Sequence, residues 1–199
     1  MRSSLRIVSG SLRGRRLTCI VTPGLRPTPD MVRQALFNIL QDVVPGRAFY
    51  DVFAGTGIVG MEALSRQAAS ATFVERDFRQ LAEIEQNLNQ FGVADRARIA
   101  KADAYRWVER WRAPAEPVNV FVSPPFADYV NRGQDMAALV MRLREVVPPA
   151  SVLVLQADRD QPFLDLPFKT EWEERHYGRN ILLIWIKGTA PSPPTVDPP

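Results

Sequence analysis

The sequence predicts an α/β protein whose mostly parallel β-sheet is covered by helices on both faces. Three observations predict this fold class. Short apolar segments alternate with amphipathic ones over most of the chain, as in parallel sheets with crossover helices. A glycine-rich turn follows the first strand of this series, and the last two strands follow one another without a helix between them. Because a tight turn joins antiparallel neighbours, we expect a reversed final strand.

The chain should begin with a basic arm, residues 1–28. Residues 5–9 and 16–21, separated by Gly10 and Gly14, predict a small β-hairpin. The first 29 residues contain six arginines and no acidic residue, whereas the rest of the chain is net negative. Guanidinium groups bind phosphate through paired hydrogen bonds, which favours a nucleic-acid partner, although coding bias in a solvated arm is an alternative. The candidate RNA-binding residues are Arg6, Arg13, Arg15, Arg16, Arg26 and Arg33.

A helix should follow the arm and end near the Pro45-Gly46 pair. Thr28 can cap its N-terminus, Pro29 suits the first turn and Asp30 suits the positive end of the helix. From there the alternation places strands at residues 48–53, 71–75, 97–101, 118–122 and 151–156. Helices should begin near Gly57, Asp77, Asp103 and Gln134.

The end of the chain departs from this alternation. Residues 169–176 and 180–187 predict two strands joined by a short turn. The main domain is therefore expected to span residues 29–187. Residues 188–199 contain five prolines and predict a disordered tail.

Residues 51–60, D-V-F-A-G-T-G-I-V-G, contain a G-x-G-x-x-G pattern between a strand and a helix. Such a turn lets the backbone approach a ligand, and the helix start offers unpaired N–H groups. Glu75, which follows Gly55 by 20 residues, ends the next strand, where a carboxylate can accept hydrogen bonds from ribose hydroxyls. Asp103 and Ala104 after the third strand would lie near an adenine, although Asp103 could equally cap a helix, and Asp51 could orient the cofactor or hold the glycine turn. A nucleoside-containing cofactor is predicted.

Both a nicotinamide dinucleotide and S-adenosylmethionine fit this pattern, and the loop Ser123-Pro124-Pro125-Phe126 favours the second. The two prolines stiffen the loop and remove two N–H donors, so mainly acceptors are left to hold a planar amino group. Phe126 would stack on the base or amide that carries this group. This arrangement suits amine methylation, with Ser123, Pro124, Pro125 and Phe126 as the catalytic loop.

Other classes of protein are disfavoured by composition. One cysteine and one histidine exclude a disulfide framework and an imidazole-rich metal site, so no metal is expected. The longest aliphatic segment, residues 181–186, is far short of the ~20 residues that a membrane-spanning helix needs. The N-terminus lacks the apolar region of a signal peptide, so we expect a cytoplasmic protein.

Several motifs together resemble the RsmD family of bacterial 16S ribosomal RNA guanine-N2 methyltransferases. They are I-V-S-G-S-L-R-G-R at residues 7–15, G-L-R-P-T-P-D at 24–30, V-R-Q-A-L-F-N at 32–38, D-V-F-A-G-T-G at 51–57 and F-V-E-R at 73–76. The resemblance covers almost everything up to residue 187. It implies a Rossmann-like class I methyltransferase fold, seven strands with the last antiparallel, S-adenosylmethionine as cofactor, and 16S RNA or an assembling small subunit as partner. The candidate cofactor-binding residues are Thr28, Asp51, Phe53, Gly55, Thr56, Gly57, Glu75, Arg76, Asp103 and Ala104.

The chain departs from the family pattern at Ser123, where the family usually has aspartate in D-P-P-F. Hydrogen bonds to charged groups contribute more than neutral ones, so the loss of charge could cost about 1 kcal/mol. Methylation should survive, but three alternatives stay open. These are methylation of another planar amine (adenine N6 in DNA or a protein glutamine), an oxidoreductase, and a weakly active or non-catalytic RNA-binding assembly factor.

Overall fold

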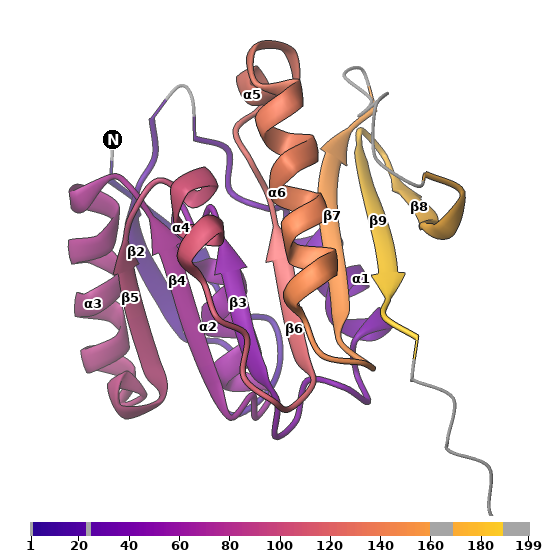
Figure 1. The fold of residues 1–199 in the computed structure, drawn as a ribbon. Coiled ribbons are helices and arrows are strands. Elements are labelled where there is room, and N and C mark those ends of the chain that lie inside the picture. Colours follow the sequence, from indigo (N-terminus) through magenta and orange to yellow (C-terminus); the bar gives the residue numbers. More distant parts are fainter. Residues whose placement is uncertain (1, 23–24, 160–168, 189–199) are drawn as a thin grey trace, which may run out of the picture.

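The computed structural model describes residues 2–22, 25–159 and 169–188. Its centre is a seven-stranded sheet (Figure 1). The strands are β3 (Ala48–Val52), β4 (Ser70–Glu75), β5 (Ala97–Lys101), β6 (Val118–Val122), β7 (Val152–Asp158), β8 (Glu173–Tyr177) and β9 (Asn180–Ile186). Their order across the sheet is β5-β4-β3-β6-β7-β9-β8. The predicted tail lies outside the described residues from position 189 onward.

The strand directions confirm the predicted fold class. Strands β3 to β7 are parallel, whereas β9 is antiparallel to both of its neighbours, β7 and β8. The last strand in sequence therefore lies inside the sheet, between β7 and β8. Strand β8 is shorter than predicted, because residues 169–171 form a turn of 3₁₀ helix, η2 (Lys169–Glu171), closed by a bond from the Trp172 N–H to the Lys169 carbonyl.

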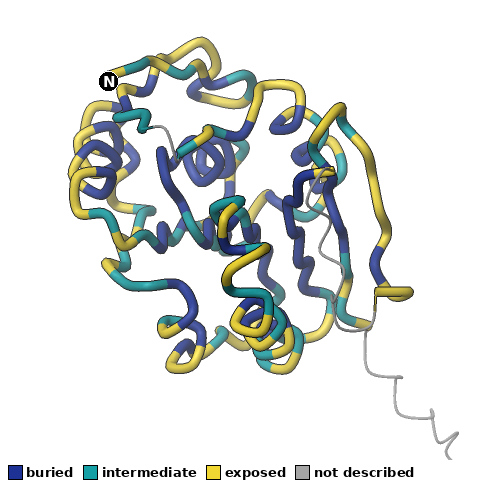
Figure 2. The backbone as a smooth tube through the Cα atoms, turned by 90° about the horizontal axis from the view of Figure 1, so that it is seen from above, coloured by how far each residue is buried: buried dark blue, intermediate teal, exposed yellow. Residues whose placement is uncertain are grey.

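Helices cover both faces of the sheet, and each face has its own apolar core. On one side lie α1 (Asp30–Ile39), α2 (Ile58–Ser65) and α3 (Phe78–Phe91), with the short η1 (Ala94–Arg96) after α3. On the other lie α4 (Ala104–Arg110), α5 (Phe126–Asn131) and α6 (Gly133–Val146). Seen from above, buried backbone follows the sheet and the inner sides of the helices, while exposed residues lie on the outside (Figure 2).

The N-terminal arm is a hairpin of β1 (Arg2–Arg6) and β2 (Arg16–Ile20), and it packs against α3. Its apolar side chains belong to the main core, with Ile7 and Leu17 fully buried. The first strand ends at Arg6 rather than at residue 9. The reason is that the Val8 N–H donates to Glu62 and the Ser9 carbonyl accepts from the Ser65 hydroxyl, so this segment bonds to α2 instead of β2.

Two predictions about the first helix, its end near Pro45-Gly46 and its Thr28 cap, were wrong, and one helix was not predicted. Helix α1 ends at Ile39, and its N-cap is Pro29; the Thr28 hydroxyl instead donates to Gln156 on β7. Helix α5, which begins at Phe126 directly after the two prolines, was not predicted. It forms the segment that follows the loop Ser123–Pro125 at the edge of the sheet (Figure 1).

Candidate functional site

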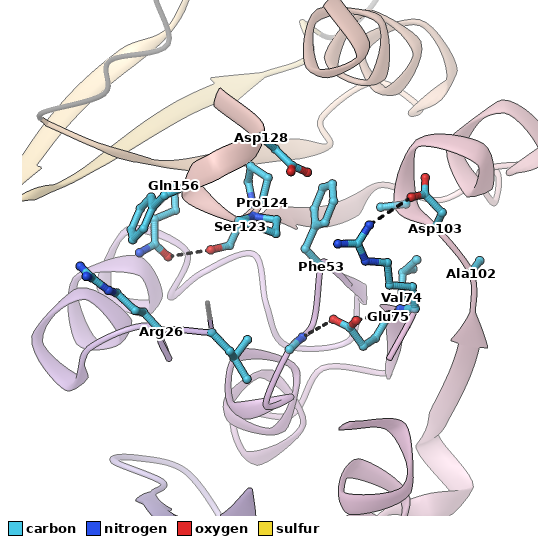
Figure 3. A pocket seen from close by; sticks show the side chains of 16 residues that line it. Arg26, Phe53, Val74, Glu75, Ala102, Asp103, Ser123, Pro124, Asp128 and Gln156 are labelled. Atoms are coloured by element: carbon cyan, nitrogen blue, oxygen red, sulfur yellow. Dashed lines mark hydrogen bonds and ion pairs between the residues drawn. The ribbon is translucent and has the colours of Figure 1, made fainter. Parts of the chain in front are cut away.

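A pocket opens at the edge of the sheet where the parallel strands β3 to β7 end (Figure 3). In α/β folds this carboxyl edge is the usual place for a ligand. The pocket brings together most of the predicted site residues: Arg26, Phe53, Gly55, Glu75, Arg76, Asp103, Ala104, Ser123, Pro124, Pro125 and Phe126. A smaller cavity that shares Phe53, Gly55 and Ser123 with it is lined also by Thr28, Asp51 and Thr56.

Glu75 stands at the end of β4 and is held by three backbone N–H groups. Its Oε2 accepts from Gly55 at 2.9 Å, and its Oε1 accepts from Arg76 at 2.8 Å and Asp77 at 2.9 Å. A carboxylate has about four acceptor positions, so one remains on Oε2. Glu75 can thus accept one ribose hydroxyl without losing a bond, and a second only by giving up one of these N–H contacts.

The backbone between β3 and α2 turns sharply at Phe53. Its φ is 68°, in the left-handed region that a bulky side chain rarely adopts. This turn aims the Gly55 N–H at Glu75 and places the Phe53 ring inside the pocket (Figure 3). The Phe53 and Tyr105 rings meet edge to face, 5.3 Å between centroids. Strained backbone of this kind is concentrated at functional sites.

The three glycines of the motif have two different roles, one in the pocket and one in packing. Gly55 has φ 52° and lines the pocket. Gly57 and Gly60 are required by packing instead, because a Cβ on them would lie 2.7 Å from Ile84 and 2.3 Å from Phe73. Gly57 does not line either cavity, and its contact with a cofactor stays a prediction.

Asp51 is buried at the end of β3, and its Oδ2 accepts from the Gly60 N–H at 2.9 Å. It therefore holds the first turn of α2 in place, the second of the two roles that the sequence allowed. The pKa of Asp51 is raised to about 7: burial raises it most, the Gly60 bond lowers it, and the negative charge of Glu75 raises it.

Asp103 caps α4, since its Oδ1 accepts from the Tyr105 N–H at 3.0 Å. Its Oδ2 forms ion pairs with Arg132 at 3.4 Å and with Arg76 at 3.8 Å. The carboxylate is therefore both a cap and a lining group of the pocket.

The loop from Ser123 to Phe126 forms the wall opposite Glu75. The Ser123 N–H donates to the Val52 carbonyl, which ties the loop to β3, and the two prolines have no N–H to donate. The Ser123 hydroxyl lies 3.2 Å from Gln156 Oε1. The Arg26 guanidinium lies over the Phe126 ring, 5.8 Å from its centroid.

The arginines do not form one patch. Arg6, Arg13, Arg15, Arg16 and Arg26 are exposed, and only Arg26 lines the pocket. The prediction that Arg33 binds RNA was wrong, because its side chain is fully buried. Its guanidinium donates to the Thr28 and Arg6 carbonyls and faces Glu62, so it holds the arm to the domain.

Sequence reasoning missed five lining residues, which are Leu25, Val74, Ala102, Asp128 and Gln156. Gln156 could have been found from the sequence, because it is a polar residue near the end of an apolar strand, at the same edge as the other candidates. Asp128 lies on the unpredicted helix α5, where its Oδ2 accepts from the Tyr105 hydroxyl at 2.8 Å. Within the described residues, no group of three potential metal ligands occurs and no helix meets the length and hydropathy of a membrane span.

Comparison with known proteins gives consistent results. Residues 5–186 match the model of a family described as Conserved hypothetical protein 95. Ribosomal RNA small subunit methyltransferase D of Haemophilus influenzae is 30% identical over 164 residues, which are 82% of this chain and 83% of that protein. The Escherichia coli K12 protein of the same name is 42% identical over 122 residues, 61% of this chain. The match spans 60% of that relative's length, less than two thirds.

Solved structures show the same architecture. An Escherichia coli structure described as the methyltransferase yhhF matches with a TM-score of 0.77 and 28% identity, over 94% of this chain and 99% of that one. A Salinibacter ruber RNA methyltransferase in complex with S-adenosyl-L-homocysteine has the same fold, with a TM-score of 0.64 and 17% identity over 87% of this chain and 100% of that one. Fold and pocket together are those of the Rossmann-like class I methyltransferases. Within that class, the chain belongs to the RsmD family.

Proposed function

We propose that this chain is an S-adenosylmethionine-dependent methyltransferase that methylates the exocyclic N2 amine of a guanine in 16S ribosomal RNA. One observation carries the proposal: the donor-poor loop from Ser123 to Phe126 and the carboxylate of Glu75 line the same pocket. A nucleoside-binding acid and a site for a planar amine thus face one space. The names of the relatives, small-subunit ribosomal RNA methyltransferases, support RNA as the substrate.

The pocket residues fit S-adenosylmethionine. Glu75 has an acceptor position for a ribose hydroxyl, Asp103 and Ala104 line the adenine side, and Phe53 offers an apolar surface. The smaller cavity beside Thr28, Asp51 and Thr56 would hold the methionine end. When bound, the cofactor supplies a methyl group on a sulfonium: the S–C bond breaks as the N–C bond forms, leaving a thioether and releasing one proton from the nitrogen.

The chain's own residues position the base. The Ser123 hydroxyl and the Pro124 carbonyl accept hydrogen bonds from the two N–H groups of the amine, and Phe126 stacks on the ring. The guanine must first leave its stack in the RNA. In this structure Arg26 covers the Phe126 ring, so a base arriving on that side takes the place of the guanidinium and brings its phosphate near Arg26. Most of the rate enhancement comes from positioning.

The exposed arginines of the arm, Arg6, Arg13, Arg15 and Arg16, bind RNA phosphates in this proposal, and affinity falls with salt. None of the described acidic residues forms an ion pair with Arg6, Arg13 or Arg16. The partner is 16S RNA or an assembling small subunit, and a substrate of this kind lies in the cytoplasm.

Side-by-side methylation assays test this function. Wild-type protein and labelled S-adenosylmethionine are incubated with 16S RNA, bare DNA or a peptide-release factor. We expect label in the RNA alone, and stabilisation against heating by S-adenosylhomocysteine but not by NADH. Label only in DNA or protein, or stabilisation only by NADH, contradicts the proposal.

A further inference from the structure

Gln156 lies behind the catalytic loop, at the end of β7, and is 6% exposed. Its side-chain oxygen Oε1 is 3.2 Å from the Ser123 hydroxyl and 3.0 Å from the Thr28 hydroxyl. Its Nε2 donates to Asn180 Oδ1 on β9 at 2.8 Å. Gln156 therefore joins the loop, the segment before α1 and the reversed strand through one side chain. Its contact with Ser123 is drawn in Figure 3.

The bond between Ser123 and Gln156 has a fixed direction. An amide oxygen can only accept, so the Ser123 hydroxyl must donate its single proton to Oε1. What remains on the Ser123 oxygen is its lone pairs. Ser123, which stands where the family usually has aspartate, can therefore only accept hydrogen bonds from a ligand, as a carboxylate does.

Gln156 is itself held so that its oxygen faces the hydroxyls. Asn180 Oδ1 accepts a hydrogen bond from Nε2, and the Thr28 hydroxyl donates a second hydrogen bond to Oε1. The Tyr129 hydroxyl donates to the Gln156 backbone carbonyl, which fixes the strand end beside α5. A buried amide with all these partners has little freedom to rotate.

We propose that Gln156 is a positioning residue that keeps the Ser123 hydroxyl in the acceptor state needed to methylate a planar amine. The inference rests on the proposed function and concerns the same site. A serine hydroxyl that could rotate would also donate to the amine nitrogen, and a lone pair engaged in that hydrogen bond cannot attack carbon. By taking the serine's proton, Gln156 leaves the nitrogen lone pair free and lets Ser123 accept an N–H.

The test uses methyl transfer to 16S RNA under saturating and limiting substrate. Gln156→Met keeps the length of the side chain and removes both hydrogen-bonding groups. We expect kcat to fall about fivefold to tenfold, as for loss of one neutral hydrogen bond in the transition state. The KM for RNA and the Kd for S-adenosylhomocysteine should stay within about twofold, because Gln156 acts through Ser123. Gln156→Glu keeps the acceptor and should retain at least about a third of the wild-type kcat.

Two comparisons separate positioning from loss of structure. In a Ser123→Ala background the hydroxyl is absent, so Gln156→Met should lower kcat by less than about twofold further. Asn119→Leu removes another buried amide, which donates to Val43 near the start of β6 and lies away from the pocket; it should leave kcat unchanged at a temperature where the variant is folded.

Three results overturn the inference: an unchanged kcat in Gln156→Met, an equal fall of kcat in the Ser123→Ala background, or a Gln156→Glu variant as slow as Gln156→Met. The last would mean that the amide nitrogen faces the hydroxyls. If the wild-type protein transfers no methyl group to RNA, the proposed function itself fails, and the inference falls with it; that result is distinguishable from the other three because they require an active wild type.

Discussion

Burial raises the pKa of Asp51 to about 7, against about 3.9 for an exposed aspartate, even though the Gly60 N–H donates to the ionised form. At a pH between these two pKa values, Asp51 is protonated in the native state and ionised in the unfolded chain. Stability contributed by this protonation is present at acidic pH and is lost as the pH rises through about 7. The buried carboxyl group also holds the first turn of α2, through its bond with the Gly60 N–H.

Asp51→Asn removes this titration and keeps an oxygen for the Gly60 N–H. We expect the unfolding free energy of the wild type, relative to the variant, to fall as the pH rises from about 4 to about 7, by up to about 1.4 kcal/mol per pH unit. Urea unfolding at a series of pH values measures the difference, in which the other titrating groups cancel. A difference that is flat or rises with pH would show that Asp51 is ionised throughout.

Glu75→Gln tests the nucleoside-binding acid. The variant loses the charge and one of its two acceptor oxygens, so S-adenosylhomocysteine should bind about tenfold more weakly by calorimetry, a loss of about 1.4 kcal/mol. Glu85→Gln, on the exposed side of α3, is the matched control and should bind as the wild type does. Equal affinity of the two variants would remove Glu75 from the site.

Individual residues were predictable where strand ends fix their place. Glu75, Asp103 and Ser123 follow strands of a parallel sheet, and all three line one pocket. Arg33 was assigned wrongly because sequence gives its charge but not its partners: Glu62, which pairs with it inside the core, is 29 residues away on another helix. Gln156 was missed because its role depends on contacts from two distant segments.

Among the elements, α1 and α2 are joined by a buried ion pair whose two side chains also bond to the backbone of the arm. Arg33 on α1 and Glu62 on α2 are both fully buried, 3.6 Å apart, and Glu62 also accepts from the Val8 N–H at 2.7 Å. Burial raises the pKa of Glu62, while the Val8 bond and the charges of Arg33 and Arg66 lower it. The pair therefore determines where the arm leaves the domain.

Arg33→Met should destabilise the protein by about 3–5 kcal/mol, because it leaves the Glu62 carboxylate buried with fewer partners. Urea unfolding measures the loss, and Arg110→Met on the outer face of α4 is the control, with an expected change below about 0.5 kcal/mol. If the two variants unfold alike, the arm is held by its apolar contacts alone.

Elements were predictable in proportion to their periodicity. The strands β6, β7 and β9 are mostly apolar and appear close to their predicted positions, whereas β8 has no apolar run and begins at Glu173 rather than at residue 169. Helix α5 was not predicted, because six residues after two prolines are too few to show a helical periodicity. The first strand was misplaced because tertiary bonds to α2 end it at Arg6, and local sequence does not contain those partners.

On the scale of the whole molecule, Arg15 of the arm lies at the end of α3 that is far from the pocket, whereas Arg26 lines the pocket itself. Arg15 donates to the Gln90 carbonyl in the last turn of α3, whereas Glu75 lies just before its first turn. Helix α3 has 14 residues, which corresponds to about 21 Å. An RNA that contacts both Arg15 and the pocket must therefore extend along this side of the protein.

This distance makes RNA binding by the arm separable from catalysis. Replacing Arg13 and Arg16 by Gln should weaken RNA binding and reduce the slope of log affinity against log salt by about 0.7–0.9 for each phosphate that the variant no longer neutralises. Binding titrations at several salt concentrations measure the slope, and kcat at saturating RNA should be unchanged. A slope equal to that of the wild type would mean that Arg13 and Arg16 stay in solvent and do not contact RNA phosphates.

The identity of the methylated nucleoside tests the central claim most directly. Small-subunit RNA from cells lacking this protein is incubated with the purified chain and S-adenosylmethionine, digested to nucleosides and analysed by mass spectrometry. A pocket that holds a planar amine against Ser123 and stacks its base on Phe126 predicts N2-methylguanosine as the product that appears. A methylated ring nitrogen, carbon or ribose, or no methylated nucleoside at all, would contradict the account.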